Sequence, residues 1–443
     1  MAAESARQEL AGRRDEVYRC MRCGFCMAVC PIYRELGEEP AVARGKIGLM
    51  AAHLDGELAM TRGFEKALKL CLSCKACTSA CPSGVAPDEL VMAARADCAA
   101  MRGMPLAKRL VLGRILPNPG LLSLCSKLAL VAGPLLFERE PGSGRMCPRF
   151  SLGIDKRRTL PPFPARGFRE MLRAEIRSGK RRGRQTWSLL EVKAPVSRMR
   201  VAFFTGCSID RLFPSIGRAV IDVLQRNGVD VVVPLAQRCC GTPALVHGDW
   251  RTARRLASEN LQVFGSLEVD AVVNACASCG CTLRHGYRQL FRESGPLQEF
   301  EGWSSKVYDI SEFLMDVAGF YPGPVRVKTA FTYHDPCHLA RGQRITKAPR
   351  ELLQLVAGLN LIEMQESDSC CGGAGSFFLE QPELSMRILG RKIKNIERTG
   401  AGVVASGCPA CLLQLGDGLA RDAERKGIRA LHPIEILAGT YAR

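Results

Sequence analysis

Sequence motifs of nucleotide-binding enzymes are missing from this 443-residue chain, and aromatic residues are scarce at 6%. No G-x-G-x-x-G follows an expected strand, and no G-x-x-x-x-G-K-[ST] loop occurs. No Ser-His-Asp or paired-carboxylate signature stands out. The chain therefore lacks the sequence signs of a dinucleotide-binding or P-loop enzyme.

A long uninterrupted apolar run is also missing. The most apolar stretch, Leu121–Phe137, contains Lys127 and Pro134 and is shorter than the ~20 residues that span a bilayer. We expect an ordinary pair of buried helices there, with an interfacial or partner-docking helix as the alternative. Met1–Arg14 carries five charged side chains and no apolar signal segment. We therefore expect a cytoplasmic protein, with peripheral contact at the inner face of the cytoplasmic membrane as an extension.

Cysteine, by contrast, is abundant, and eight of the 22 cysteines form two copies of one motif. Both copies read C-x2-C-x2-C-x3-C-P, the thiolate pattern that binds a pair of [4Fe–4S] clusters. Because the fourth cysteine of each run cannot reach back to its own cluster, it ligates the other one. The predicted ligands are Cys20, Cys23, Cys26 and Cys81 for cluster 1, and Cys71, Cys74, Cys77 and Cys30 for cluster 2.

Structural zinc and disulfide bridges are the alternatives for these eight cysteines. Zinc sites usually use two separated C-x2-C pairs, a pattern that four cysteines within eleven residues fit poorly. In a cytosolic chain, so many cysteines indicate metal rather than bridges. Apolar surroundings tune a cluster by limiting water. The side chains expected to provide them are Met21, Phe25, Met27 and Leu72.

Much of the net charge of +18 lies in one segment. Residues 145–200 contain sixteen Lys or Arg against four Asp or Glu, together with several Pro. We expect a linker or surface arm that meets an anionic membrane surface or an acidic partner. Nucleic acid is not expected as a partner, because no nucleic-acid motif accompanies the basic run Lys180–Arg184.

The second half of the chain is duplicated. Each copy is expected to run strand, Cys, helix, strand, Cys-Cys-Gly, helix, strand and C-x2-C, and equivalent cysteines are offset by 130 to 132 residues. Short β-rich runs at Arg200–Thr205 and Asp230–Pro234 flank a helical pattern, which predicts an α/β unit. Each cysteine group follows a strand, where open α/β sheets place their ligands.

Ten cysteines in these copies form two candidate metal sites. Adjacent thiolates can bridge or ligate neighbouring metal ions, and Gly241 and Gly372 allow close backbone approach. The candidates are Cys207, Cys239, Cys240, Cys276 and Cys279 in the first copy, and Cys337, Cys370, Cys371, Cys408 and Cys411 in the second. His334 and His338 flank Cys337 and are candidates for tuning a cluster or relaying protons. The spacing indicates a metal site without identifying the metal, so zinc remains an alternative to iron–sulfur clusters here. The other cysteines, expected to be ordinary thiols, are Cys98, Cys125, Cys147 and Cys281.

The order of these motifs resembles the iron–sulfur subunits of glycolate oxidase and of related D-lactate dehydrogenases. Matching stretches include Cys23–Cys26, Ala43–Ile47, Cys81–Gly84 and Cys370–Gly375. The resemblance implies an electron-transfer subunit of an oxidoreductase acting on CH–OH groups. A separate FAD-containing subunit would oxidise a 2-hydroxy acid, and this chain would pass the electrons to a quinone or another acceptor. No residue of this chain is then expected to be catalytic.

The Cys-Cys-Gly (CCG) units also resemble those of heterodisulfide reductase, in which ten such cysteines of one subunit hold two non-cubane [4Fe–4S] clusters. One alternative is therefore a heterodisulfide-reductase-like subunit with redox chemistry at the CCG clusters. Another is the iron–sulfur subunit of a glycerol-3-phosphate dehydrogenase. A third, from a different class, is a metal-stabilised binding protein that uses the basic segment.

The expected fold is mixed. An α-helical two-cluster ferredoxin-like domain is predicted for residues 1–103, followed by a helical and basic linker region over 104–198. Two duplicated α/β CCG domains follow, at 199–325 and 326–443.

Overall fold

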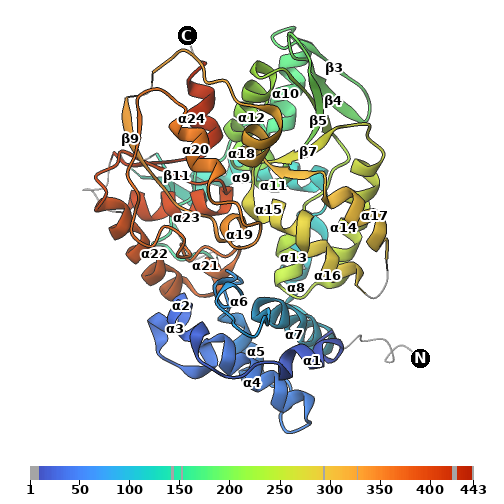
Figure 1. Ribbon diagram of the computed structural model, residues 1–443, viewed down its shortest axis with the longest axis vertical. Helices are drawn as coiled ribbons and strands as arrows, with labels where there is room; N and C mark the ends of the chain where they lie inside the picture. The colour runs from blue at the N-terminus through green and yellow to red at the C-terminus, as the bar shows by residue number, and fades with distance from the viewer. Residues whose placement is uncertain are drawn as a thin grey trace.

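The computed structural model describes residues 9–140, 144–150, 153–292, 295–326, 328–421 and 427–441. Three bodies pack together (Figure 1): a helical N-terminal domain, drawn in blue, and two α/β units that lie side by side above it. The α/β units, CCG unit 1 (green to yellow) and CCG unit 2 (orange to red), share one hydrophobic core. The N-terminal domain has a core of its own.

Helices are the regular elements of the N-terminal domain over its described residues 9–102. Its longest helix begins at Pro87, and the acidic Asp88 and Glu89 suit the positive end of the helix dipole. Leu90, Val91 and other side chains of this helix face the core. The elements are η1 (Ala11–Arg13), α1 (Arg14–Tyr18), α2 (Phe25–Val29), α3 (Pro31–Leu36), η2 (Glu39–Ala41), α4 (Ala43–Leu54), α5 (Arg62–Lys69), α6 (Ala76–Ser79) and α7 (Pro87–Arg102).

The region that follows is folded onto both CCG units. Its elements are α8 (Leu106–Leu110), the π-helical η3 (Val111–Ile115), α9 (Pro119–Leu136), β1 (Phe137–Arg139), β2 (Met146–Pro148), α10 (Phe168–Arg177), β3 (Gly183–Gln185) and β4 (Leu189–Val192). Strand β4 pairs with a strand of unit 1, and α10 packs against the helices of that unit. Arg158 is buried in an ion pair with Asp417 of unit 2, and Arg169 pairs with Asp210 of unit 1. The basic segment therefore differs from the expected surface arm, because acidic side chains far away in the sequence bind its arginines.

Helix α9 corrects the expectation of two buried helices. It is one helix of 18 residues with a mean hydropathy of 1.5, and 6% of it is buried. By length and composition alone it is long enough to cross a membrane. Its most exposed apolar side chains recur at spacings of three and four residues and so form one stripe. They are Leu121, Leu124, Leu128, Val131 and Leu135.

CCG unit 1 is built on a six-stranded sheet in the order β3-β4-β6-β5-β7-β8, in which β5 to β8 run parallel. Strand β6 is buried along its whole length, as expected for a parallel strand covered on both faces. The elements are β5 (Met199–Phe204), α11 (Gly206–Arg211), α12 (Pro214–Arg226), β6 (Val229–Pro234), α13 (Thr242–Val246), α14 (Trp250–Gly265), β7 (Ala271–Asn274), α15 (Ala277–Cys281), η4 (Thr282–Gly286), α16 (Tyr287–Phe291), α17 (Leu297–Ser304), β8 (Val307–Asp309), α18 (Ile310–Glu312) and η5 (Phe313–Ala318).

CCG unit 2 repeats this topology in a four-stranded parallel sheet, ordered β10-β9-β11-β12. The order corresponds strand for strand to β6-β5-β7-β8, which confirms the predicted mixed fold with duplicated α/β units. The elements are β9 (Thr329–Tyr333), α19 (Cys337–Ala340), α20 (Ala348–Gln354), β10 (Leu359–Leu361), α21 (Phe377–Glu380), α22 (Pro382–Glu397), β11 (Val403–Ala405), α23 (Pro409–Ala420), β12 (Arg429–Leu431) and α24 (Pro433–Gly439). Helix α24 packs against α12 of unit 1. The predicted domain boundaries stay predictions.

Candidate metal centres

The two ferredoxin-type motifs surround two cavities in the N-terminal domain. One cavity is lined by Cys20, Cys23, Cys26, Cys77 and Cys81. The other is lined by Cys30, Cys71, Cys74 and Cys77. Each cavity thus holds all four predicted ligands of one cluster, including the one that comes from the other motif. The structure brings both predicted sets together, and the ligation itself stays a prediction.

Left-handed backbone conformations shape the motif loops. Gly24 has a φ of 89°, directly before α2, and in the second motif Ser73 and Lys75 have φ values of 51° and 60°. Such angles are uncommon for residues other than glycine, and they cluster at functional sites. The chain therefore turns sharply between neighbouring thiols in both motifs.

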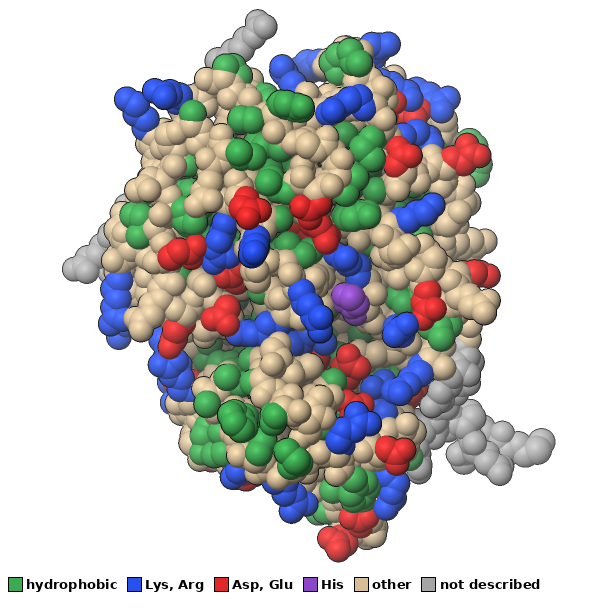
Figure 2. All heavy atoms as spheres, in the orientation of Figure 1, with side chains coloured by type: hydrophobic (Ala, Val, Ile, Leu, Met, Phe, Trp, Pro, Cys, Tyr) green, Lys and Arg blue, Asp and Glu red, His purple; other side chains and the backbone are tan. Residues whose placement is uncertain are grey.

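The cluster 1 site lies at the molecular surface. Cys23 is exposed, and the side chains of Met21 and Phe25 are 68% and 62% exposed. Leu72, in the second motif, is buried. The expected apolar sheath is therefore wrong for Met21 and Phe25, which form an open apolar rim instead. Figure 2 shows hydrophobic side chains gathered on this part of the N-terminal domain.

A buried lysine lies beside the cluster 2 site. Lys46 lines the cavity, and its ammonium group donates a hydrogen bond to the carbonyl oxygen of Ala41. Burial lowers the pKa of Lys46, whereas negative charge on Cys71 and Cys30 favours its protonated form. A buried ammonium group needs a compensating anion. A thiolate-bound cluster would supply that anion, so these residues fit the predicted group.

In both CCG units the cysteines lie at the carboxyl ends of parallel strands. In unit 1, Cys207 follows β5, the Cys239-Cys240 pair follows β6, and Cys276 follows β7. Cys207 Sγ lies 4.0 Å from Cys239 Sγ. Cys279 lies next to Cys240 and Cys276, which raise the pKa of its thiol. The structure therefore brings all five predicted residues of unit 1 together.

Unit 2 repeats the arrangement. Cys370 lies next to Cys337 and Cys371, which raise the pKa of its thiol. Cys411 lies next to Cys371 and Cys408, which raise the pKa of its thiol. All five predicted residues of this unit are therefore neighbours, and each is buried or half-buried.

The two thiol groups meet at the boundary between the units. Cys276 lies next to Cys408 and lowers the pKa of its thiol. Ser278 Oγ, from unit 1, lies 3.5 Å from Cys408 Sγ, and the amide of Ala277 donates to Gly407 O across the same boundary at 3.1 Å. The ten thiols thus form one continuous series that runs from Cys207 to Cys337.

Neighbouring thiols lower the pKa of some cysteines in this series. The hydrogen bond from Cys370 lowers the pKa of Cys337 to about 6. Hydrogen bonds from neighbouring thiols, Cys239 and Cys279, hold the pKa of Cys240 well below its usual value. Buried sulfur donors with several thiolates among them are the ligands that soft metals and iron–sulfur clusters prefer.

A second buried lysine, Lys392, places a positive charge close to the thiols of CCG unit 2. It is buried in α22, and its ammonium group donates to the carbonyl oxygens of Glu366 and Ser367. Burial lowers its pKa, while the negative charge of Cys371 and Cys370 raises it. Lys46 and Lys392 therefore play the same part at different sites. Neither role was expected from the sequence, although Lys46 lies in the stretch Ala43–Ile47 that carries part of the family resemblance.

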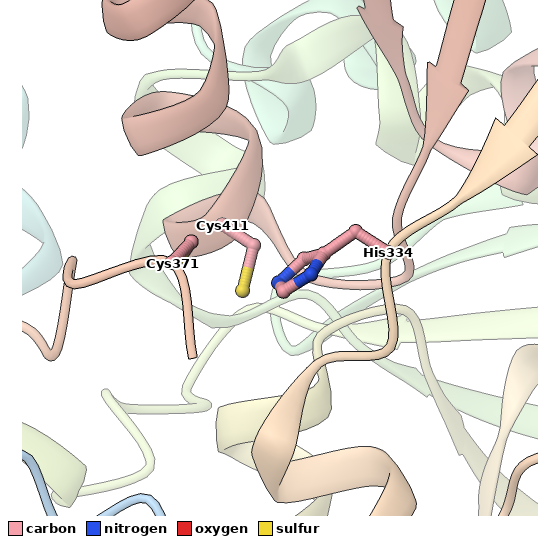
Figure 3. A group of neighbouring side chains, drawn as sticks. All are labelled: His334, Cys371 and Cys411. Atoms are coloured by element: carbon pink, nitrogen blue, oxygen red, sulfur yellow. The ribbon is translucent and has the colours of Figure 1, made fainter. Parts of the chain in front are cut away.

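His334 and His338 make different contacts. A ring nitrogen of His334 and the sulfur atoms of Cys371 and Cys411 all lie within 4.8 Å of one another, and Figure 3 shows the ring directed toward Cys411. His334 Nδ1 donates to Ser367 O at 3.2 Å, and its buried Nε2 has no partner among the described residues. His338 Nε2 donates to Ser73 O at 3.0 Å. The predicted tuning and proton-relay roles stay predictions.

CCG unit 2 adjoins the cluster 2 site. Cys74 and Cys337 belong to one apolar cluster that also contains Cys370 and Cys30. The sites therefore follow one another in space: cluster 1, cluster 2, the thiols of unit 2 and the thiols of unit 1. The four remaining cysteines lie outside the predicted sets, and Cys98 donates to Met60 Sδ at 3.8 Å.

Two protein-family models match the parts of the chain that contain these sites. Residues 16–85 match the model of the 4Fe-4S dicluster domain, and residues 201–284 and 331–416 match that of the CCG cysteine-rich domain. These family matches confirm the prediction that the chain binds iron–sulfur clusters.

Several similar proteins are iron–sulfur subunits or act in lactate utilization. A probable glycolate oxidase iron–sulfur subunit of Bacillus subtilis is 32% identical over 433 residues, which cover 95% of this chain and 93% of that protein. A fumarate reductase (CoM/CoB) subunit of Methanothermobacter marburgensis is 33% identical over 247 residues, covering 55% of this chain and 47% of that protein. Lactate utilization protein A 2 of Bacillus cereus is 30% identical over 241 residues, covering 54% of this chain and 98% of that protein.

Proposed function

The chain belongs to the family of glycolate oxidase iron–sulfur subunits, and we propose that it carries electrons from a separate FAD-containing subunit, which oxidises glycolate or D-lactate, to a quinone. The observation that carries this proposal is the spatial order of the thiol sites, from an exposed cluster 1 site to the buried CCG thiols. An electron-transfer chain needs such closely spaced centres. The partner subunit determines which substrate is oxidised. Glycerol-3-phosphate is therefore an alternative to glycolate and D-lactate.

The rim around the cluster 1 site supports docking of the FAD-containing subunit there. Met21, Phe25 and Val29 are exposed apolar side chains beside Cys23. An exposed apolar patch next to a redox centre suits a protein partner, because docking excludes water and shortens the electron-transfer distance. Electrons then enter at the N-terminal domain.

Helix α9 supports peripheral contact with an anionic membrane from the cytoplasmic side. Its apolar stripe is exposed, and basic side chains lie beside it on α10. Glu170 of α10 accepts a hydrogen bond from Ser123 of α9. Arg166, Arg173 and Arg177 line a surface depression around the same Glu170. An apolar stripe flanked by basic residues is typical of helices that lie in the membrane interface. A membrane location would bring the chain to its quinone acceptor.

The CCG thiols are proposed to hold two non-cubane [4Fe–4S] clusters. Five sulfur donors in each unit are one more than a cubane needs. Zinc, with four ligands, leaves one thiol of each set unused. Measuring the iron and the acid-labile sulfide in protein purified without oxygen distinguishes iron–sulfur clusters from zinc in the CCG units. About sixteen iron atoms per chain are expected for four clusters of four iron atoms, whereas zinc with about eight iron atoms would overturn this assignment.

The experiment that tests the function is purification of the chain with its partners. We expect a flavoprotein to copurify, and glycolate or D-lactate to reduce the iron–sulfur signals of the complex. Re-oxidation should follow addition of a quinone. Reduction of the clusters by the substrate without any flavoprotein would contradict the proposed division of labour.

A heterodisulfide-reductase-like activity is the second candidate, favoured by the complete and buried set of ten thiols. In that case a disulfide substrate would change the EPR signal of a CCG centre and release two thiols. A chain whose CCG signals do not respond to any disulfide, while responding to the flavoprotein, favours the first function.

A further inference from the structure

The two CCG units differ at one buried residue beside their thiols. His334 lies three residues before Cys337, and the offset of 130 residues pairs it with Phe204, which lies three residues before Cys207. The pairing of β9 with β11, and of β5 with β7, gives the same correspondence. His334 and Phe204 are each 1% exposed. The duplicated site therefore has an imidazole ring in unit 2 where unit 1 has a phenyl ring.

The two rings occupy corresponding places among the thiols. In unit 1, a methyl group in place of a hydrogen atom on Gly206 would lie 3.1 Å from Cys279 Sγ and 3.6 Å from Phe204 Cε1. The phenyl ring is therefore close to this sulfur atom. The equivalent of Cys279 in unit 2 is Cys411, and Figure 3 shows the ring of His334 directed toward it. Of these two rings, the imidazole alone has an atom that can bind a metal.

The hydrogen bond of His334 determines which of its ring nitrogens is free. Nδ1 lies 3.2 Å from the carbonyl oxygen of Ser367. Because a carbonyl oxygen can only accept, Nδ1 carries the proton, and the neutral ring has its lone pair at Nε2. Nε2 is buried and has no hydrogen-bond partner among the described residues. Metal-binding histidines typically have this arrangement, in which the second ring nitrogen donates to a carboxylate or a backbone carbonyl.

Two sulfur donors lie close to the imidazole. A ring nitrogen of His334 and the sulfur atoms of Cys371 and Cys411 all lie within 4.8 Å of one another. Ligand atoms around one metal ion are about 3.5 Å apart when their bonds to the ion are about 2.0 to 2.3 Å long. Small side-chain movements are therefore enough to enclose an ion. The backbone stays in place, because the His334 amide donates to Ala405 O at 2.9 Å.

Two other histidines of the CCG units have different contacts. His432 Nδ1 accepts a hydrogen bond from the amide of Ile434 at 3.1 Å, so its proton is on Nε2 and no lone pair remains for a metal. His338 Nε2 donates to Ser73 O in the N-terminal domain, and no three-ligand group among the described residues includes His338. His334 therefore combines a free lone pair with two neighbouring sulfur donors.

We propose that His334 Nε2 is a sixth protein ligand of the centre in CCG unit 2, bound to an iron atom of the cluster that the five cysteines of this unit hold. This inference rests on the proposed function, because it assumes the clusters proposed for the CCG thiols. Imidazole is a suitable ligand for iron, and it adds no negative charge to a site that already has five sulfur donors. The two centres then differ chemically: unit 1 provides sulfur alone, and unit 2 provides sulfur and nitrogen.

The test uses the cluster-loaded chain, both oxidised and reduced with dithionite. The EPR signal of unit 2 is the one that Cys370→Ser removes. Pulsed EPR of this signal should show strong coupling to a nitrogen nucleus, and the coupling pattern should change when the chain contains ¹⁵N-labelled histidine. His334→Phe, which copies unit 1, should lose the coupling. His285→Phe, at an exposed residue of η4, should keep it. A wild-type signal that histidine labelling leaves unchanged would overturn the proposal, and so would a coupling that persists in His334→Phe.

A second variant keeps a metal ligand in this place. His334→Cys replaces the imidazole with a thiolate, so the iron content should stay the same while the nitrogen coupling disappears. The thiolate adds negative charge, and the one-electron reduction equilibrium of unit 2 should shift at least tenfold toward the oxidised form. An EPR-monitored redox titration measures this shift. An unchanged equilibrium would overturn the role of His334 as a ligand.

These measurements do not use the flavoprotein, so they fail independently of the proposed function. Nitrogen coupling in a chain that the flavoprotein does not reduce would leave the ligand and remove the function. A chain that the flavoprotein reduces, but that shows no histidine coupling, would leave the function and remove the ligand. If metal analysis finds zinc in unit 2, X-ray absorption at the zinc edge replaces EPR. Nitrogen scattering that disappears in His334→Phe then supports the ligand, and unchanged scattering overturns it.

Discussion

The thiol of Cys276 in CCG unit 1 lies next to the thiol of Cys408 in CCG unit 2 and holds the pKa of Cys408 well below its usual value. These residues occupy equivalent places in the duplicated sequence, each starting a C-x2-C pair after the third parallel strand of its unit. The duplication therefore places its two candidate metal sites face to face. Electrons can pass between units at this contact without crossing a wide layer of protein.

The first prediction concerns this contact. Cys408→Ser should remove a ligand of unit 2 and lower the iron content by about one cluster, or about four iron atoms per chain. The N-terminal clusters should keep their EPR signals, because their ligands lie in another domain. Iron analysis and EPR of the purified protein provide the measurement. Cys125→Ser is the matched control, since Cys125 lies on α9 outside the predicted sets. A full iron content in Cys408→Ser would contradict the assignment.

The second prediction concerns the buried charge of Lys392. Reduction adds negative charge to a cluster, and a nearby ammonium group stabilises the reduced form. Lys392→Met should therefore lower the reduction potential of the centre in unit 2. For a one-electron reduction, each tenfold change in the equilibrium constant shifts this potential by about 60 mV. An EPR-monitored redox titration measures it.

Lys394→Met is the control for this titration. Lys394 lies two residues farther along α22 and is exposed, so solvent screens its charge. The same shift in both variants would mean that the effect does not arise from the buried site.

The cysteine motifs and the duplicated strands were predictable from the sequence because both depend on local spacing. Cysteines at every third residue, followed by a proline, fit few kinds of site. The constant offset of 130 to 132 residues between equivalent cysteines indicates that one structural unit occurs twice. The juxtaposition of Cys276 with Cys408 was not predictable in this way. It depends on how two folded units pack, and no short-range pattern encodes that packing.

The basic segment and α9 show the limits of composition. Arg158 and Asp417 are 259 residues apart, so a run of arginines looks like a solvated arm until the fold brings acids to it. The apolar pattern of α9 is the same for a helix buried in its own chain and for one whose apolar face is left exposed. The pattern therefore predicted the commoner arrangement, buried helices, which the structure shows to be wrong.

The third prediction tests the folded state of the basic segment. Arg158→Met removes one of the two positive charges that pair with the buried carboxylate of Asp417, and only Arg421 then remains beside it. The free energy of unfolding should fall by about 3 kcal/mol, as for other broken buried pairs. Urea denaturation of the loaded protein measures this change. Arg157→Met, at the exposed neighbouring residue, should have little effect. Equal losses would argue that burial of Arg158 is unimportant.

The fourth prediction tests the membrane contact of α9. Val131→Glu places a charge in the middle of the exposed apolar stripe and should weaken binding to vesicles of phosphatidylglycerol and phosphatidylcholine at least tenfold. Val196→Glu is the matched control, because Val196 is about equally exposed but lies outside α9. Vesicle co-sedimentation measures both. Unchanged binding by Val131→Glu would contradict a membrane contact through this stripe.

The last prediction follows from a buried carboxyl group at the start of α18. Asp309 Oδ1 accepts a hydrogen bond from the amide of Ser311 at 2.8 Å, whereas its buried Oδ2 has no partner among the described residues. Burial raises the pKa of Asp309 to about 7. A carboxyl group whose pKa is raised by folding contributes stability that is complete below its unfolded pKa and is lost as the pH rises through the folded value.

Asp309→Asn should therefore remove part of the pH dependence of stability, because asparagine resembles the protonated acid and caps a helix as well as aspartate does. Between pH 5.5 and pH 8 the variant should gain about 2 kcal/mol relative to the wild type. Urea unfolding at the two pH values measures the gain. Asp316→Asn, at an exposed residue of η5, should show the same difference from wild type at both. A stability difference for Asp309→Asn that does not change with pH would mean that Asp309 stays ionised in the folded protein.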